Sequence, residues 1–389
     1  MEKATENLRE TDFQTYDLIC LSHLRWDFVY QRPQHLMSRF ARQRRVFFVE
    51  EPVLTEDATH LSIGEREANL YVVVPHLNRA ETESRTVEIL MKETLDKLFA
   101  ESAIKNFVLW YYTPMALGFS NHLKPKAVVY DCMDELSMFK FAPPELIANE
   151  AALFKKADVI FTGGQSLYEA KKNLHSNIFA MPSSIDTAHF KQARNVSESP
   201  SDQSAIPSPR FGYIGVIDER MDLVLIDEIA EKRPEWQIVM IGPVVKIGED
   251  ELPRRANIHY LGMKTYDELP AYIAGWDVAL MPFAINDSTK FISPTKTPEY
   301  LAAGKPVVST AIRDVVRPYG EQNLVAVADT SDEFIAAAET LMSEDRTEKI
   351  KEVDEFLARN SWDKTWRKMS DSIGKAVAGN YSTAANIKA

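Results

Sequence analysis

The sequence has only two cysteines, Cys20 and Cys132, and each lies in an apolar, strand-like run. We expect two buried thiols, because an isolated cysteine in such a run behaves as a small hydrophobic residue. No paired cysteine and histidine spacing is present, which argues against a structural zinc site and a disulfide framework. No apolar run approaches the roughly 20 residues of a membrane span. The opening segment, MEKATENLRETDFQ, is polar and unlike a signal peptide, so we expect a cytoplasmic protein.

Positive charge is the minority sign. Lysine and arginine together number 45 against 57 aspartate and glutamate residues, which leaves a net charge of −12. Proteins dedicated to nucleic-acid binding usually show the opposite balance, so we expect no nucleic-acid partner. A G-x-G-x-x-G motif after a strand is also missing, which argues against a dehydrogenase.

Short apolar runs alternate with helical patterns along most of the chain. Runs such as VFFVE and VLWYY predict strands that are covered on both faces, as in a parallel sheet. In the first half the predicted strands are 17–21, 46–50, 70–74, 107–111, 127–131, 158–162 and 177–181, and the predicted helices are 33–42, 87–100, 144–156 and 166–173. This alternation is the βαβ pattern of a doubly wound sheet.

The segment RNVSESPSDQSAIPSP interrupts this pattern, because it is rich in serine and proline and poor in large apolar residues. The pattern then resumes with predicted strands at 210–215, 237–241, 258–261, 278–281, 306–309 and 324–327, and predicted helices at 222–232, 266–274, 298–303, 331–343, 347–360 and 362–377. We predict an α/β protein with two doubly wound domains, residues 1–193 and 210–360, a linker at 194–209, and a C-terminal helix and tail at 361–389 that packs back on the first domain. Ligands of such sheets bind at the carboxyl ends of strands, so both domains offer loops to the cleft between them.

The segment FISPTKTPEYLAAGKPVVST carries the clearest chemical signal. Ser293 and Thr295 precede a predicted helix, and backbone N–H groups at a helix start favour anions. Lys296 adds a positive charge suited to a diphosphate, and the Glu299 carboxylate could accept hydrogen bonds from a ribose diol. The alternative is a capped helix in which Glu299 only complements the macrodipole.

This segment resembles the donor-site helix of GT-B glycosyltransferases, particularly the family-4-type retaining enzymes, whose pattern S-P-x-K-x-x-E-Y-x-A-A-G-K-P-V-V it matches. The resemblance implies two Rossmann-like domains facing each other across a cleft. It implies that Glu299 binds the nucleotide ribose and that Thr295 and Lys296 lie near the diphosphate or the transferred sugar. The family's E-x7-E pattern has a second glutamate eight positions earlier, where this chain has Phe291.

Further segments resemble the same family. FGYIGVI is similar to the first strand and loop of the donor domain, where Gly215 would let the backbone approach the phosphates. Arg220 in the following loop is the candidate that steadies the leaving diphosphate; the alternative is a solvated loop arginine. Gly242 follows the second donor-domain strand, and Gly262 and Met263 fall where the nucleotide base usually rests.

The first domain is expected to bind the acceptor. The loop after its first strand contains a W-D-F-x-x-Q-R-P-Q-H-L phrase that resembles a subgroup of bacterial glycosyltransferases. Aromatic rings there could stack on a sugar, and Arg32 could hold a phosphate or carboxylate. The alternative is that Trp26 belongs to the core and that the polar residues cap a helix. The candidate acceptor-binding residues are His23, Trp26, Gln31, Arg32 and His35.

Asp134, in the segment VVYDCMDELSMF, is the candidate for an acceptor-side carboxylate near the reacting carbon, and the alternative is a helix cap. With Asp131 it forms D-x-x-D rather than the D-x-D that other glycosyltransferases use with a metal. GT-B enzymes typically need no bound metal, so we expect neither a metal nor a cofactor beyond the nucleotide-sugar co-substrate. The catalytic candidates are therefore Asp134, Arg220 and Lys296.

Four arginines, Arg39, Arg42, Arg44 and Arg45, cluster on and after the first predicted helix. Such a patch could contact anionic lipid headgroups at the inner face of a membrane, which would suit a lipid-linked acceptor. The alternative is a solvated charged surface.

The resemblance as a whole implies a glycosyltransferase that moves a sugar, with retention, from a nucleotide-diphosphate-sugar to an acceptor hydroxyl in bacterial surface glycan or glycolipid synthesis. One alternative is a GT-B sugar-nucleotide epimerase, which would need no acceptor. The other is a non-catalytic sugar-nucleotide-binding or assembly protein. Lys296 and Glu299 argue against this last alternative, and Phe291 argues for it.

Overall fold

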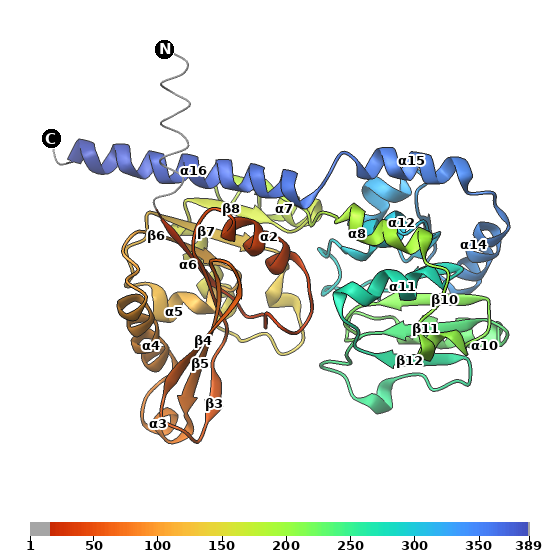
Figure 1. The fold of residues 1–389 in the computed structure, drawn as a ribbon, viewed down its shortest axis with the longest axis horizontal. Helices are drawn as coiled ribbons and strands as arrows, with labels where there is room; N and C mark the ends of the chain where they lie inside the picture. The colour runs from red at the N-terminus through yellow and green to blue at the C-terminus, as the bar shows by residue number, and fades with distance from the viewer. Residues whose placement is uncertain (1–15, 388–389) are drawn as a thin grey trace, which may run out of the picture.

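The computed structural model describes residues 16–387, with side chains through residue 379, and it forms two α/β domains (Figure 1). The polar opening segment, on which the expectation about a signal peptide rests, lies outside the described residues. Among the helices described, none combines the length and the apolar character that a membrane crossing requires. Cys20 and Cys132 are both free and buried, as the sequence predicted.

The first domain is built on a nine-stranded sheet in which eight strands follow the order β3-β5-β2-β1-β6-β7-β8-β9 and the ninth, β4, pairs with β5 outside this order. Every pair is parallel except the hairpin of β4 with β5. Its strands are β1 (Asp17–Leu21), β2 (Val46–Val49), β3 (Val53–Thr55), β4 (His60–Glu67), β5 (Leu70–Asn78), β6 (Phe107–Tyr111), β7 (Ala127–Cys132), β8 (Val159–Thr162) and β9 (Ile178–Ala180). All residues of β2, β6, β7 and β8 are buried, because helices cover both faces of the sheet.

Between residues 16 and 180, the helices of this domain are α2 (Arg32–Ala41), α3 (Arg79–Ser84), α4 (Val87–Glu101), α5 (Leu117–Ser120), α6 (Leu146–Lys156) and α7 (Gln165–Lys171). Leu36 and Phe40 of α2 pack on one face of the sheet. Leu95 of α4 and Leu153 of α6 pack on the other face, in a second core cluster. The sheet is therefore doubly wound, as the sequence predicted.

The second domain has a six-stranded parallel sheet of order β12-β11-β10-β13-β14-β15. The strands are β10 (Arg210–Ile214), β11 (Gln237–Ile241), β12 (Ile258–Gly262), β13 (Val278–Met281), β14 (Val307–Ser309) and β15 (Ala326–Val327). Its helices are α8 (Thr187–Lys191), α9 (Ser201–Ser204), α10 (Leu223–Lys232), α11 (Leu269–Ala274), α12 (Lys296–Ala302), α13 (Arg313–Val315), α14 (Ser331–Ser343) and α15 (Thr347–Leu357). Strand order reverses at β1/β6 in the first sheet and at β10/β13 in the second, where ligand crevices of this fold class form.

The boundary between the domains lies earlier than the sequence predicted. Ile185 and Phe190 already pack in the core of the second domain. The segment 194–209, predicted as a linker, is packed on that domain as well: the buried Gln203 donates to the Tyr272 carbonyl at 2.9 Å and accepts from Trp276 Nε1 at 2.9 Å. Its serines and prolines form turns and a short helix rather than a free connection.

The last helix, α16 (Trp362–Ile387), leaves the second domain and runs along the first (Figure 1). Trp362 and Met369 are buried in the same cluster as Phe40 of α2. The Trp362 ring also stacks on His35, with ring centroids 4.5 Å apart. The helix extends ten residues beyond the predicted end at 377.

The four clustered arginines do not form an open basic surface. Arg39 and Arg42 both pair with Asp363 of α16, at 3.1 and 3.2 Å. Arg44 is buried, and Arg45 forms an ion pair at 2.6 Å. Much of their charge is thus used within the protein, and membrane contact stays a prediction.

Candidate active site

A polar cavity between the domains is lined by all three catalytic candidates, Asp134, Arg220 and Lys296. Asp134 follows β7 of the first domain, Arg220 lies in the loop after β10 of the second domain, and Lys296 opens α12. In each sheet the parallel strands bring their carboxyl ends to one edge, and loops from these edges of both sheets line the cavity, so residues 162 positions apart meet there. Four further site candidates also line this polar cavity: Gln31, Arg32, Ser293 and Thr295.

Arg220 is held in place by Asp218, two residues earlier. The Asp218 carboxylate accepts from Arg220 Nε at 3.0 Å and from Nη2 at 2.6 Å, and Asp218 itself is buried. Burial acts to lower the pKa of Arg220, but the hydrogen bonds and charge of Asp218, with Asp134 beyond it, raise that pKa. The guanidinium is therefore always charged and fixed in direction, which suits a diphosphate ligand.

The end of the Lys296 side chain lies directly against Gly215. A Cβ on Gly215 would lie 2.1 Å from Lys296 Cε, and the φ of Gly215 is +143°, which favours glycine. Gly242, with φ +142°, lies against Gly215 in turn, where a Cβ would be 1.9 Å from the Gly215 carbonyl oxygen. Two donor-site glycine candidates thus have a structural requirement for glycine. Burial lowers the pKa of Lys296, opposed by the charge of Glu299.

Glu299 lies one helical turn after Lys296, in the first turn of α12. Burial raises the pKa of Glu299 to about 7, although the Lys296 charge and a hydrogen bond to Thr295 act to lower it. Burial likewise raises the pKa of Asp134 to about 6, opposed by Arg220, Arg32 and Lys296. Two carboxyl groups that titrate near neutrality beside fixed cations are typical of a functional site rather than of helix caps.

A second, aromatic cavity lies beside the polar one and contains the predicted nucleotide-binding residues. Gly215, Gly242 and Met263 line it from the second domain, and Trp26 lines it from the first. Gly262, with φ +70°, ends β12 next to Met263 and accepts from the Gly242 N–H at 2.9 Å. Six of the eight donor-site candidates thus line one of two cavities, one polar and one aromatic, whereas Gly262 and Glu299 line neither of them.

The structure places the candidate acceptor-binding residues in different environments. Gln31 lines the polar cavity at the start of α2, and His23 has a buried Nδ1 for which the described residues offer no hydrogen-bond partner. Burial lowers the pKa of His23 to about 4, so the ring is neutral. Trp26 is 8% exposed and packs edge-on against Phe48. His35 lines neither cavity, because it is buried under α16.

Arg32 touches the polar cavity but its guanidinium is already used. It is 1% exposed, forms a two-pronged ion pair with Asp131 at 2.8 and 2.9 Å, and donates to the Met181 carbonyl at 2.7 Å. The arrangement supports the start of α2 from the end of β7. Binding of an acceptor phosphate by Arg32 stays a prediction.

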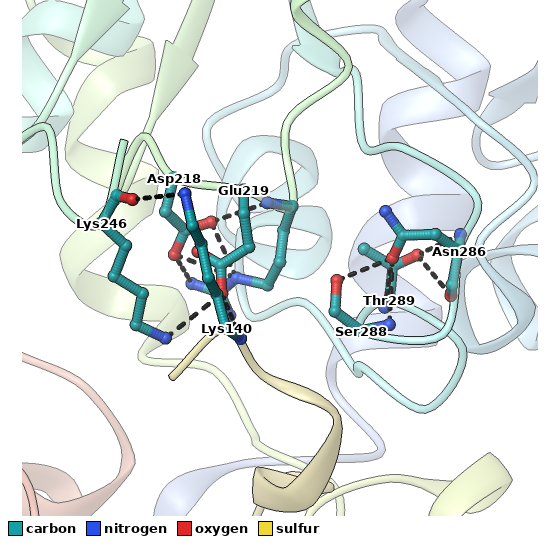
Figure 2. A network of polar contacts seen from close by, with 8 residues as sticks. Lys140, Asp218, Glu219, Lys246, Asn286, Ser288 and Thr289 are labelled. Carbon is teal, nitrogen blue, oxygen red and sulfur yellow. Dashed lines mark hydrogen bonds and ion pairs between the residues drawn. The ribbon is translucent and has the colours of Figure 1, made fainter. Parts of the chain in front are cut away.

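Sequence reasoning missed a set of contacts that crosses the cleft (Figure 2). The Lys140 N–H of the first domain donates to Glu219 of the second at 3.2 Å, and Lys140 Nζ donates to the Lys246 carbonyl at 3.0 Å. Phe139 lies between two cations, 5.3 Å from Arg220 and 4.9 Å from Lys246. No local pattern signals these pairs, because their partners are 79 to 107 positions apart.

Phe291 occupies the position of the family's second glutamate, and its ring packs against the core of the first domain. The neighbouring Ile292 and Ser293 line the polar cavity instead. Among residues 16–387, no group of three or more histidines, cysteines, aspartates or glutamates is placed to hold a metal ion. The expectation of a metal-free reaction stays a prediction.

Comparison with known proteins indicates the same class of protein as the geometry of the site does. Residues 208–344 match the family model of Glycosyl transferases group 1. The "Putative teichuronic acid biosynthesis glycosyltransferase TuaH" of Bacillus subtilis strain 168 is 27% identical over 304 residues, which are 72% of this chain and 75% of that protein.

Solved structures share the whole architecture. Sucrose-phosphate synthase of Thermosynechococcus elongatus superimposes with a TM-score of 0.70 at 12% identity, covering 94% of this chain and all of that one. Anabaena HepE, in complex with UDP and glucose, gives 0.64 at 13% identity over 92% and 98% of the two chains. At these identities the likeness shows the fold, which is GT-B. The protein is a GT-B glycosyltransferase. More particularly, residues 208–344, in its second domain, are similar to the group 1 glycosyltransferases.

Proposed function

We propose that this protein transfers a sugar from a nucleotide-diphosphate-sugar to an acceptor hydroxyl, with retention and without a bound metal, in bacterial surface glycan or glycolipid synthesis. The observation that carries the proposal is the convergence of Asp134, Arg220 and Lys296 from both domains on one polar cavity. The relative named for teichuronic acid biosynthesis supports the surface-glycan assignment. The neighbour that holds UDP and glucose supports a nucleotide-sugar donor.

The roles follow from charge and position. Arg220 and Lys296 bind the diphosphate and stabilise the charge that develops on it as the glycosidic bond breaks, which is where fixed cations contribute most. Glu299 accepts hydrogen bonds from the ribose diol. Asp134, on the opposite wall, faces the cationic sugar carbon. Closure of the two domains brings Asp134 to the donor, so the chemistry needs both domains.

A donor screen tests the assignment. Thermal unfolding with UDP-, GDP-, ADP- and dTDP-sugars should show one class that raises the melting temperature, because a ligand that binds only the folded state stabilises it. Nucleoside diphosphate release with oligosaccharide and lipid-linked acceptors then measures transfer. An isomerised donor formed without acceptor would instead identify an epimerase. A chain that no donor stabilises would contradict the proposal.

Lys296→Ala tests the cation assignment. Loss of one transition-state contact of this kind costs about 10²–10³ in kcat. Lys290→Ala is the matched control, because this exposed lysine lies six residues earlier and does not line the polar cavity. Equal activity of the two variants would remove Lys296 from the mechanism.

Membrane contact is a separate part of the proposal. Arg42 is 59% exposed, which makes it the most accessible of the four clustered arginines. Co-sedimentation with vesicles that contain anionic phosphatidylglycerol should exceed that with neutral phosphatidylcholine vesicles, and Arg42→Gln should reduce the difference. Equal sedimentation with both vesicles would remove the membrane from the proposal.

A further inference from the structure

The aromatic cavity has walls from both domains. Its first-domain wall is a run of consecutive residues, 26–30, which is called the aromatic loop below. Its second-domain wall contains Gly215 and Gly242, the two glycines beside Lys296, together with Met263 and Tyr266. The sequence assigned the aromatic loop to the acceptor, yet the structure places it opposite the predicted base-binding residues.

The rings of this loop are available to a ligand. Phe28 and Tyr30 are each 40% exposed, whereas Trp26 is buried at the base of the loop. The Tyr30 ring stacks on Tyr266 of the second domain, with centroids 4.4 Å apart and planes 28° apart. Tyr266 is stacked on its other face by His189 at 4.1 Å. The loop and the second domain thus meet through a short aromatic column at the edge of the cavity.

The backbone of the aromatic loop is fixed from both sides. Gln34 of α2 donates to the Trp26 carbonyl at 2.7 Å and to the Val29 carbonyl at 3.1 Å. Glu50 after β2 accepts from the Trp26 N–H at 2.7 Å. A platform held this way loses little conformational entropy when a planar ligand stacks on it.

Tyr266, in the second-domain wall of the aromatic cavity, also interacts electrostatically with Glu299, the predicted ribose-binding residue. Burial raises the pKa of Tyr266, and the negative charge of Glu299 raises it further. The Tyr266 hydroxyl is buried and has no hydrogen-bond partner among the described residues. A buried hydroxyl without a partner is costly, and a ligand hydroxyl would satisfy it.

We propose that the aromatic loop is the first-domain half of the nucleotide site: the base of the donor lies in the aromatic cavity against Phe28 and Tyr30, and the Tyr266 hydroxyl joins Glu299 at the ribose. The inference rests on the proposed function, since it needs a nucleotide-sugar donor. Its consequence is that the first domain recognises donor as well as acceptor. Donor binding then favours the closed arrangement of the domains, because the base is contacted from both sides only when they meet.

The test measures nucleotide affinity and acceptor KM together. Titration calorimetry with UDP, GDP, ADP and dTDP defines the preferred nucleotide of the unaltered protein. Phe28→Ala and Tyr30→Ala should each weaken that affinity by roughly tenfold, as loss of one ring from a stacked base does, and leave acceptor KM unchanged. Phe179→Ala is the matched control, because this ring is 38% exposed on the edge strand β9 and lines neither cavity.

Two outcomes distinguish a failure of this inference from a failure of the proposed function on which it rests. If Glu299→Ala loses nucleotide binding while Phe28→Ala and Tyr30→Ala keep it and raise acceptor KM instead, the loop stacks on the acceptor and the inference is wrong, whereas the proposed function stands. If the unaltered protein binds none of the four nucleotides, the proposed function itself fails. Tyr266→Phe adds a finer readout: it should weaken binding of the preferred ribonucleotide more than that of its 2′-deoxy form.

Discussion

Glu299 shows how a single residue can carry a measurable pH dependence. Its pKa of about 7 means that the side chain is mostly neutral at pH 6 and mostly ionised at pH 8. The ionised form is the stronger acceptor for a ribose diol, so donor affinity should rise by roughly tenfold across this interval. The diphosphate diester of a nucleotide-sugar keeps its charge over the same range and does not mask the effect.

Calorimetric titrations of the stabilising nucleotide-sugar between pH 6.5 and 8 measure the upper part of this rise, which is about fourfold for a group with a pKa of about 7. Glu299→Gln should bind more weakly and show a flat profile, because the amide does not ionise. The lower limit of pH 6.5 keeps Asp134, with a pKa of about 6, largely ionised throughout. A profile in the Gln variant as steep as in the unaltered protein would assign the titration to another group.

At the same scale, the sequence predicts candidate site residues where these residues lie in one short segment. Lys296 and Glu299 belong to one contiguous motif, and the glycine required at position 215 lies in a recognisable strand-loop segment. The contacts of Tyr30 with Tyr266 could not be predicted in this way, because they join residues 236 positions apart through the closing of two domains. A buried histidine and a ligand-binding histidine look alike in sequence, so only the structure shows that His35 is packed against Trp362; a role of His35 in acceptor binding stays a prediction.

Among the elements, α16 shows how much a remote segment contributes to the first domain. Trp362 is 2% exposed and stacks on His35 of α2, and it lies in the core cluster that covers one face of the sheet. Trp362→Ala should therefore destabilise the first domain by about 3–5 kcal/mol, the cost of a large cavity. Thermal or urea unfolding followed by circular dichroism measures the loss.

Lys368→Ala serves as the comparison on the same helix. Its side chain is exposed, so the change in unfolding free energy should stay within about 0.5 kcal/mol. Similar stability of the two variants would mean that α16 does not support the first domain in solution.

The elements also show where periodicity alone fails. Strand β4 carries HLSIGERE, a largely exposed antiparallel strand without an apolar run, and it escaped prediction. The parallel strands β1, β2 and β6 to β8 were predicted because burial on both faces produces continuous apolar runs. The segment 194–209 was read as a linker because serine and proline form turns and free connections alike, and only the burial of Gln203 distinguishes them.

At the scale of the whole molecule, the two domains are joined by more than the cleft network. Asp314 of the second domain accepts from the Gln165 and Ser166 N–H groups, both at 2.9 Å, at the start of α7 in the first domain. Gly164 permits this approach, because a Cβ there would lie 2.3 Å from Asp314 Oδ2. Arg313 also pairs with Glu169 of α7. The closed arrangement is thus held by a carboxylate that crosses the interface.

Asp314→Ala should shift the domains toward an open arrangement. The variant loses two charge-assisted hydrogen bonds, each worth about 1.5–3 kcal/mol when a charged group takes part, so the ratio of closed to open molecules should fall by at least about a hundredfold. Small-angle scattering should show a larger radius of gyration, and kcat should fall because Asp134 no longer reaches the donor. Arg313→Gln is the matched control on the same short helix. Its ion pair with Glu169 is 47% and 34% exposed on the two sides and contributes about 0–1 kcal/mol, so scattering and kcat should change little. If the scattering of Asp314→Ala equals that of the unaltered protein while its kcat falls, Asp314 acts on the chemistry and not on domain closure. If neither the radius of gyration nor kcat changes, the domains close without this contact. The contacts of Lys140 with Glu219 across the cleft are then the ones that hold the closed arrangement.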